Sequence, residues 1–310
     1  MFLFPPRGRM ISWVAAIGAI WAAPGASAQA AKPQRAQPPC ASSAHFDYLG
    51  AKVLRSRPSE GLPAAYMFAA DTKLIDADGA PNAYHPDDSG HGAQCPDNGY
   101  GLDCLASAGF PGSDWWHTVL VRDPASGGKP YVQSSGPWAG YYVSMTSLRN
   151  TAYAGVQSPL SYVNAAQVPY VVLPAPIYRT RGMGGMGDIG FAINLSNGRT
   201  TPFVIADEGP VEPLGEASVA FWQALGGDAP NPRNGAGLPA GRIAYIVFPK
   251  SRRDADIGWP IDAGRLRAEA QRLLGAYGGE AALSACFARP APGVDLARAD
   301  EPAPGARVRP

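Results

Sequence analysis

An Asn-Gly pair between two apolar runs is the feature that most constrains how this chain can fold. The runs cover residues 190–195 and 201–206, and Asn197-Gly198 lies between them. Asn-Gly flanked by apolar runs is the strongest short-range signal for a β-hairpin. The second strand would then deliver Asp207 at its end, ahead of the turn-forming residues 208–213. We therefore expect a hairpin that presents one acidic side chain at the start of a stiff loop.

A second acidic side chain follows nine positions after Asp207. Residues 215–225 read Gly-Glu-Ala-Ser-Val-Ala-Phe-Trp-Gln-Ala-Leu, which predicts a short helix that stops at Gly226-Gly227. Glu216 would lie in the first turn, where the helix dipole favours a negative charge. Two interpretations stay open: the two acids form a catalytic pair, or each simply suits a strand end and a helix start.

The rest of the chain predicts a mainly β fold with a few helices. Further strands are expected at residues 66–70, 118–121, 168–173 and 243–248. One long helix is expected from the Asp262 cap to about Tyr277. The 37 Gly and 32 Pro residues favour long loops, and no alternation of strand and helix supports a doubly wound sheet. We expect a small closed or half-closed barrel.

The N-terminal residues indicate an exported protein. Residues 1–28 combine early arginines, an apolar run and a small-residue cleavage site, which is typical of a secretory signal peptide. The less favoured alternative is an anchor helix, because the apolar run is short for a membrane span. Residues 29–39 would be a linker, residues 40–287 a single catalytic domain, and residues 288–310 a disordered Pro-rich tail. We expect a monomer in the periplasm or the medium.

Charge and cysteine content narrow the possible partners. The net charge is +1 and the chain has no basic run, so we expect no binding to nucleic acid and no binding to a membrane after the signal peptide is removed. We also expect no cofactor. An even set of cysteines in an exported chain indicates two disulfides. We expect Cys95 to pair with Cys104 and Cys40 with Cys286. Zinc is the alternative, but the histidines share no ligand spacing with these cysteines, so we expect no metal.

An acidic turn, Asp76-Ala-Asp78-Gly79, precedes the hairpin by more than a hundred residues. It has three possible interpretations: an ordinary surface turn, a carboxylate pair for a cationic or polyhydroxyl ligand, or a calcium loop. The third lacks the bidentate Glu and the ligand ladder of a helix-loop-helix site. Two carboxylates beside one groove are also the minimum apparatus for cleaving a glycosidic bond, one as proton donor and one to activate water.

These motifs resemble glycoside hydrolase family 75, the endo-chitosanases. The likeness rests on the runs Phe203–Asp207 and Gly215–Ser218, in which Asp207 lies nine residues ahead of Glu216. Pro169–Val172 and Asp76–Gly79 precede them, and the likeness spans about residues 64–250. The resemblance implies hydrolysis of β-1,4 bonds in chitosan, with inversion, by Asp207 and Glu216. The chain departs from the family where Ala206 replaces a Gly and where residues 208–213 replace a Thr-, Asn- and Asp-rich loop.

If the chain acts on chitosan, its acids need separate roles. A helix dipole would keep Glu216 ionised as the base, while Asp207, flanked by Ile205, would have a raised pKa and serve as the acid. Chitosan carries ammonium groups and flat sugar rings, so further carboxylates and aromatic side chains should bind it. The candidates are Asp76, Asp78, Asp188, Trp115 and Trp116, with burial in the core as the alternative for the two tryptophans.

A shorter string, Val204–Pro210, is similar to the Asp-x-Gly-Pro turn of double-psi β-barrels. Such barrels occur in lytic transglycosylases of the rare lipoprotein A type and in expansin-like proteins. This resemblance implies a double-psi-like barrel for the fold. It also supplies two alternative functions, a murein lytic transglycosylase that uses Asp207 alone and a non-hydrolytic protein that binds wall polysaccharide.

Overall fold

The computed structural model describes residues 44–56, 64–88 and 99–288. The predicted signal peptide, the linker and nearly all of the Pro-rich tail lie outside these ranges, as do Cys40 and Cys95. Cys104 and Cys286 lie within them, and neither is a free thiol. The pairing of the four cysteines therefore stays a prediction.

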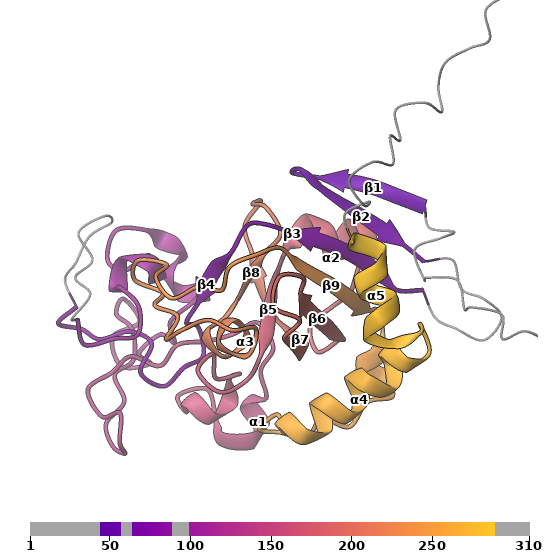
Figure 1. Cartoon of the computed structure of the whole chain (residues 1–310). Coiled ribbons are helices and arrows are strands. Elements are labelled where there is room, and N and C mark those ends of the chain that lie inside the picture. The colour runs from indigo at the N-terminus through magenta and orange to yellow at the C-terminus, as the bar shows by residue number, and fades with distance from the viewer. Residues whose placement is uncertain (1–43, 57–63, 89–98, 289–310) are drawn as a thin grey trace, which may run out of the picture. The chain divides into compact units, whose positions relative to one another are not determined.

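The fold is mainly β, as expected, and is built on one nine-stranded sheet that curls into a half-barrel (Figure 1). The strands lie in the order β1-β2-β3-β9-β6-β7-β5-β8-β4. Their bounds are β1 Ala44–Tyr48, β2 Ala51–Arg55, β3 Tyr66–Ala70, β4 Leu74–Asp76, β5 Tyr170–Pro174, β6 Ile189–Asn194, β7 Thr200–Gly209, β8 Glu216–Ser218 and β9 Ile243–Phe248. Most neighbours are antiparallel, whereas β5 with β7 and β4 with β8 are parallel.

Helices are short apart from one. The α-helices are α1 Thr151–Ala154, α2 Ala175–Arg181, α3 Val219–Ala224, α4 Ala263–Gly275 and α5 Gly279–Phe287, and the 3-10 helices are Leu105–Ala108, Asp114–Thr118, Pro159–Ser161 and Ser251–Arg253. The long helix α4 begins as the sequence predicts, because the Asp262 side chain caps it by accepting a hydrogen bond from the Arg265 backbone N–H at 2.7 Å. Among the described residues, no helix is long and apolar enough to cross a membrane.

The predicted hairpin is confirmed, although its turn is not a tight two-residue one. Strands β6 and β7 are antiparallel, and the connection spans residues 195–199. Only Gly198 takes a positive φ, of 73°. The Asn197 side chain accepts a hydrogen bond from the Arg199 N–H and donates one to the carbonyl of Leu225. The Asn side chain thus ties the loop to the end of α3.

The expected strand at residues 118–121 is wrong, whereas the strands at 66–70 and 243–248 have the predicted bounds. The 118–121 segment follows the 3-10 helix Asp114–Thr118 and makes only an isolated bridge between Leu120 and Ser144. The Val119 carbonyl accepts from the Met145 N–H, and the Val121 N–H donates to the Val143 carbonyl, so the segment pairs locally within the loop region without forming a continuous ladder.

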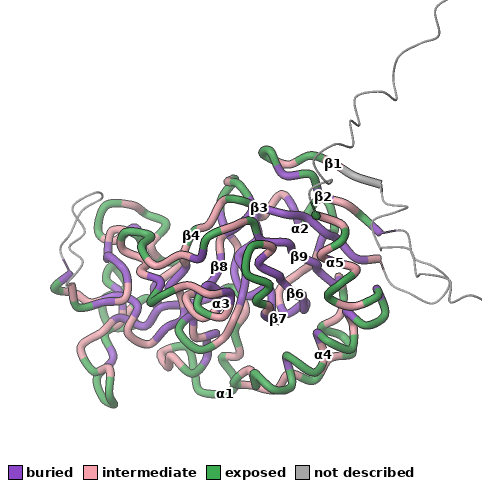
Figure 2. The backbone as a smooth tube through the Cα atoms, viewed as in Figure 1, coloured by how far each residue is buried: buried purple, intermediate pink, exposed green. Residues whose placement is uncertain are grey.

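Two apolar layers cover the sheet, one on each face. On the first, which we call the α4 face, Leu266, Ala270 and Leu283 of α4 and α5 pack with alternate strand residues such as Phe191 and Val204. On the second, the α3 face, Ile177, Phe221 and Trp222 of α2 and α3 pack with Phe203 and Tyr245. Strands β6 and β9 are buried along their whole length, as Figure 2 shows.

Helix α3 begins at Val219, four residues after the first residue of the helix that the sequence predicts. The Ser218 hydroxyl caps it by accepting from the Phe221 N–H at 3.2 Å. Glu216, Ala217 and Ser218 instead form β8, which pairs with β4 and with Val171 of β5. Glu216 therefore lies on a strand, and the expectation that it occupies the first turn of a helix is wrong.

Candidate active site

Neighbouring strands bring the predicted acids together. Asp207 lies on β7, Glu216 begins β8 and Asp76 ends β4, and β5 lies between β7 and β8. Ala217 packs on the α3 face, so Glu216, which precedes it on the strand, points to the α4 face. Asp76 is the register partner of Ser218 and shares that face. The acids converge although their positions in the chain lie up to 140 residues apart.

A β-bulge turns Asp207 toward the same face. Val171 pairs with Ile205, but the next residue, Val172, pairs with Asp207, so Ala206 is an extra residue in β7. Val172 and Ala206 both pack on the α4 face. Bulges of this kind re-aim side chains and are over-represented next to active sites. In an unbulged strand Asp207 would point to the apolar α3 face.

Three hydrogen bonds fix the Asp207 carboxylate. Its Oδ1 accepts from the Ser147 hydroxyl at 2.6 Å, from the Ser147 N–H at 3.2 Å and from the Glu208 N–H at 2.7 Å. The Ala206 carbonyl also accepts from the Leu148 N–H at 2.8 Å, which holds the 147–148 segment against β7. All three donors to Asp207 favour its ionised form.

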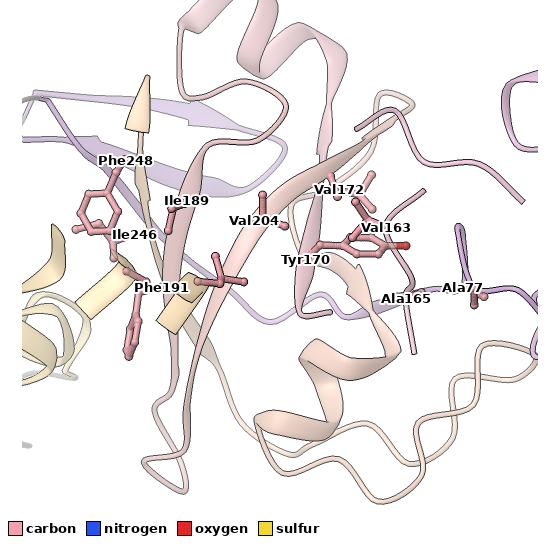
Figure 3. Close-up of a cluster of buried hydrophobic side chains, with 14 of the residues drawn as sticks. Ala77, Val163, Ala165, Tyr170, Val172, Ile189, Phe191, Val204, Ile246 and Phe248 are labelled. Atoms are coloured by element: carbon pink, nitrogen blue, oxygen red, sulfur yellow. The ribbon is translucent and has the colours of Figure 1, made fainter. Parts of the chain in front are cut away.

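The acidic turn contributes Asp78 beside Asp76. The Asp76 Oδ1 accepts from the Asp78 N–H at 2.8 Å, and the Asp78 Oδ1 accepts from the Tyr84 hydroxyl at 2.8 Å and the Ser144 hydroxyl at 3.1 Å. Tyr170 donates its hydroxyl to the Asp78 carbonyl at 2.9 Å. Figure 3 shows this hydroxyl pointing out of the apolar cluster, toward the segment that carries Ala77.

The turn is specified by Gly79. Its φ is 74°, and a Cβ at this position would collide with the backbone carbonyl of Val163. Only glycine fits such a conformation without strain. The acidic turn is therefore packed against the loop region rather than lying free on the surface, which removes the first of its three interpretations.

Burial raises the pKa of every acid in this cluster. Burial, together with the charge of Asp207, raises the pKa of Asp76 to about 7. Burial raises the pKa of Asp207 to about 6, against the three hydrogen bonds that lower it. The pKa of Asp78 is raised well above its usual value by burial and by the charges of Asp76 and Asp207.

Glu216 is buried beside the same acids, and its pKa is also affected by Glu212. Burial comes first in raising its pKa well above the usual value, followed by the charge of Asp76 and a hydrogen bond with the Glu212 side chain. The charge of Glu212 acts in the same direction as the charge of Asp76. Within the described ranges, no Lys or Arg side chain forms an ion pair with any acid of the cluster.

The cluster also has the geometry to hold a cation. Asp76, Asp78 and Asp207 each offer one carboxylate oxygen, and these oxygens lie within 4.8 Å of one another. Hard cations such as Ca²⁺ and Mg²⁺ prefer such oxygen ligands. Protons, a metal ion or the ammonium groups of a ligand could therefore balance the charge of these three residues.

Three other predicted ligands lie apart from the cluster. Asp188 is only 3% exposed, and its carboxylate accepts hydrogen bonds from the N–H groups of Gly185, Lys250 and Arg252, so it fixes the start of β6. Trp116 packs against the core with its ring 5.5 Å from that of Phe110, and Trp115 is 47% exposed. No contact within the described part of the chain joins either tryptophan to the acids.

Several residues of the site were missed by the sequence interpretation. Ser147 has no motif around it and lies 60 residues from Asp207. Tyr170 was placed on a strand but given no role. Asp103, whose pKa burial raises to about 6, adds its charge near Asp76. Glu212 lies in the turn-rich loop. Its spacing of four residues from Glu216 was the one feature of the sequence that could have indicated a contact between the two side chains.

The raised pKa values predict that the fold is more stable in acid than at neutral pH. An acid with a folded pKa above its unfolded value stabilises the fold below the unfolded pKa and loses that contribution as pH rises through the folded pKa. For Asp76 this pH window runs from its ordinary pKa of 3.8 to about 7. We expect Asp76→Asn to raise stability at pH 8 by about 1 kcal/mol or more, or about 2–4 °C in Tm, and to change it little at pH 4.

Thermal unfolding of both proteins at pH 4 and pH 8 checks this expectation. Asp71→Asn is the matched control, because the Asp71 side chain is 80% exposed and should have no effect at either pH. An equal effect of Asp76→Asn at both pH values would contradict the expectation. If Ca²⁺ or Mg²⁺ at pH 8 raises the Tm of the wild type but not of Asp76→Asn, a metal ion rather than protons balances the cluster.

The sequence matches no protein-family model, and it has no significant match among curated proteins. The likeness to family 75 glycoside hydrolases therefore rests on the short motifs alone.

Proposed function

We propose that this protein is a secreted glycoside hydrolase that cleaves β-1,4 bonds of chitosan-like polysaccharides. The observation that carries the proposal is the cluster of four acids, Asp76, Asp78, Asp207 and Glu216, on one face of the sheet with no cationic side chain paired to them in the described ranges. Such a cluster suits a polymer that carries ammonium groups and a reaction that needs one protonated and one ionised carboxyl.

Glu216 is the better proton donor. A general acid must hold its proton at the working pH, and burial, the charge of Asp76 and the bond to Glu212 all favour the protonated form. This reverses the division of roles expected from the sequence, which made Glu216 the base. The reason is structural: Glu216 lies on β8, so no helix dipole stabilises its negative charge.

Asp207 is then the base. Burial raises its pKa to about 6, but the hydrogen bonds from Ser147 and from the Glu208 N–H favour its ionised form. In the proposed reaction, Asp207 takes a proton from water as the water oxygen bonds to the anomeric carbon. The bond from that carbon to the leaving oxygen breaks at the same time, and Glu216 gives its proton to this oxygen. The attack from the opposite face inverts the anomeric configuration.

Asp76 and Asp78 have a separate task, which is to bind substrate ammonium groups. A positive charge close to a buried carboxyl lowers its pKa, so an ammonium group would ionise these two acids on binding. The ammonium groups of chitosan would thereby compensate for the unfavourable free energy of burying like charges together. An uncharged polysaccharide such as cellulose offers no such compensation.

The proposal is tested by exposing the full-length protein to chitosan and, separately, to peptidoglycan. We expect new reducing ends from chitosan, carried by amino-sugar oligomers, and none from peptidoglycan. Anhydro ends released from peptidoglycan would instead indicate the lytic transglycosylase. Binding of either polymer with no cleavage would indicate an expansin-like role.

A further inference from the structure

A pocket of about 750 Å³ lies beside the loop region and shares no residue with the acid cluster. Its volume is within the range of about 300–1,000 Å³ that is typical of small-molecule sites. Trp138 and Trp259 contribute to its wall, although they lie far apart in the sequence. None of the described residues that line the pocket carries a charge.

Gln133 supplies the pocket with a fixed hydrogen-bond acceptor. The residue is only 7% exposed, and its Nε2 donates to the carbonyls of Pro81 at 2.6 Å and Tyr142 at 3.2 Å. Both partners are acceptors, so the amide orientation is forced. Among the described residues no donor bonds to Oε1, and this oxygen is not sealed from solvent. Oε1 is therefore the atom that Gln133 offers to a ligand.

Asn164 supplies the complementary donor. Its Oδ1 accepts from the Ala166 N–H at 2.9 Å, which orients the amide and leaves Nδ2 without an acceptor in the described part of the chain. Trp259 donates its indole N–H to the Leu160 carbonyl at 3.0 Å, which fixes its ring. The wall thus combines aromatic surfaces, one fixed acceptor and one fixed donor.

We propose that this pocket binds an uncharged, N-acetylated saccharide. The apolar face of a sugar ring can pack on an indole, while an acetamido group offers an N–H to Gln133 and a carbonyl to Asn164. An ammonium group is disfavoured, because it would lose its hydration without gaining a carboxylate partner. The inference stands apart from the proposed hydrolase, since the two sites use different residues and opposite charge requirements.

The test measures binding of tri-N-acetylchitotriose to the full-length protein by titration calorimetry. We expect the trimer to bind more tightly than its fully deacetylated counterpart and than cellotriose, which has no acetamido group. Trp138→Ala should weaken binding about tenfold or more, whereas Trp138→Phe keeps an aromatic face and should weaken it less. Asn164→Asp keeps the bond to Ala166 but removes the donor, so it should also weaken binding about tenfold or more.

Three results would overturn the inference. One is equal affinity for the acetylated and deacetylated trimers. Another is unchanged binding in Trp138→Ala and Asn164→Asp proteins that keep the thermal stability of the wild type. The third is loss of trimer binding in Asp207→Asn, which would place the trimer at the acid cluster. Binding that survives in Asp207→Asn and fails in the pocket variants supports the inference, whether or not chitosan is hydrolysed.

Discussion

Exchanging Glu216 for Gln is expected to lower the rate of chitosan hydrolysis by about 10²–10⁴-fold, because the leaving oxygen then departs without a proton. Gln keeps the shape of the side chain and cannot supply that proton. The loss should be small on an aryl β-glycoside of a glucosamine oligomer whose leaving group needs no protonation. Initial rates on both substrates, compared with the wild type, check the expectation.

Asp207→Asn should lower the rate on both substrates, since water is no longer activated in either case. Azide, a small anionic nucleophile, should restore part of the rate to Asp207→Asn and none to Glu216→Gln on chitosan. The acid limb of the pH–rate profile, which reflects ionisation of Asp207 near its pKa of about 6, should vanish from the residual activity of Asp207→Asn.

Acids that lie away from the cluster provide matched controls for both substitutions. Glu269→Gln and Asp256→Asn alter surface ion pairs with Arg272 and Arg265, and neither should change the rate. If Asp207→Asn rather than Glu216→Gln keeps its activity on the aryl glycoside, the acid and base are assigned the wrong way round. If both variants hydrolyse chitosan at the wild-type rate, the cluster is not the catalytic site.

The second large effect is expected at Arg233, which forms a buried ion pair with Asp88. Both side chains are 2% exposed. The Arg233 guanidinium also donates to the carbonyl of Gly101, and Asp88 accepts from the Gly101 N–H, so the pair anchors the segment before Cys104. Removing one partner of a buried pair typically costs about 3–5 kcal/mol, because the other charge stays buried without compensation.

Urea unfolding of Arg233→Met should therefore show a loss of about that size. The double variant Asp88→Asn with Arg233→Met should recover part of it, since Asp88 then no longer leaves a buried charge without its partner. Arg265→Met removes an exposed pair with Asp256 and should cost no more than about 1 kcal/mol. A loss in Arg233→Met no larger than in Arg265→Met would show that the pair does not anchor the fold.

Local sequence patterns were sufficient to predict the elements that are defined by residues close together in the sequence. The hairpin of β6 and β7 follows from its apolar runs and Asn197-Gly198, and α4 follows from Asp262 and helical spacing. Strands β3 and β9 were also recognised, because both are continuous apolar runs that are buried on both sides of the sheet.

Non-local pairing explains where the prediction failed. Strand β8 has only three residues, and its partner Leu74 lies 142 positions earlier than Glu216. Nothing in residues 215–218 indicates that partner. The sequence therefore predicts a helix that begins before Ser218, whereas Ser218 is the residue that caps it. The meeting of Asp76 and Asp207, and the bonds from Ser147, depend on the same long-range contacts.

The extra residue in β7 limits what a spacing between two acids can reveal. If β7 ran without the bulge and kept Ala206, the two acids would still be nine positions apart, yet Asp207 would face the apolar layer of Phe221 and Trp222. Two chains with the same interval could then carry their acids on opposite sides of the sheet. A search for proteins that share this site should therefore align the residues before Asp207 as well as the interval after it.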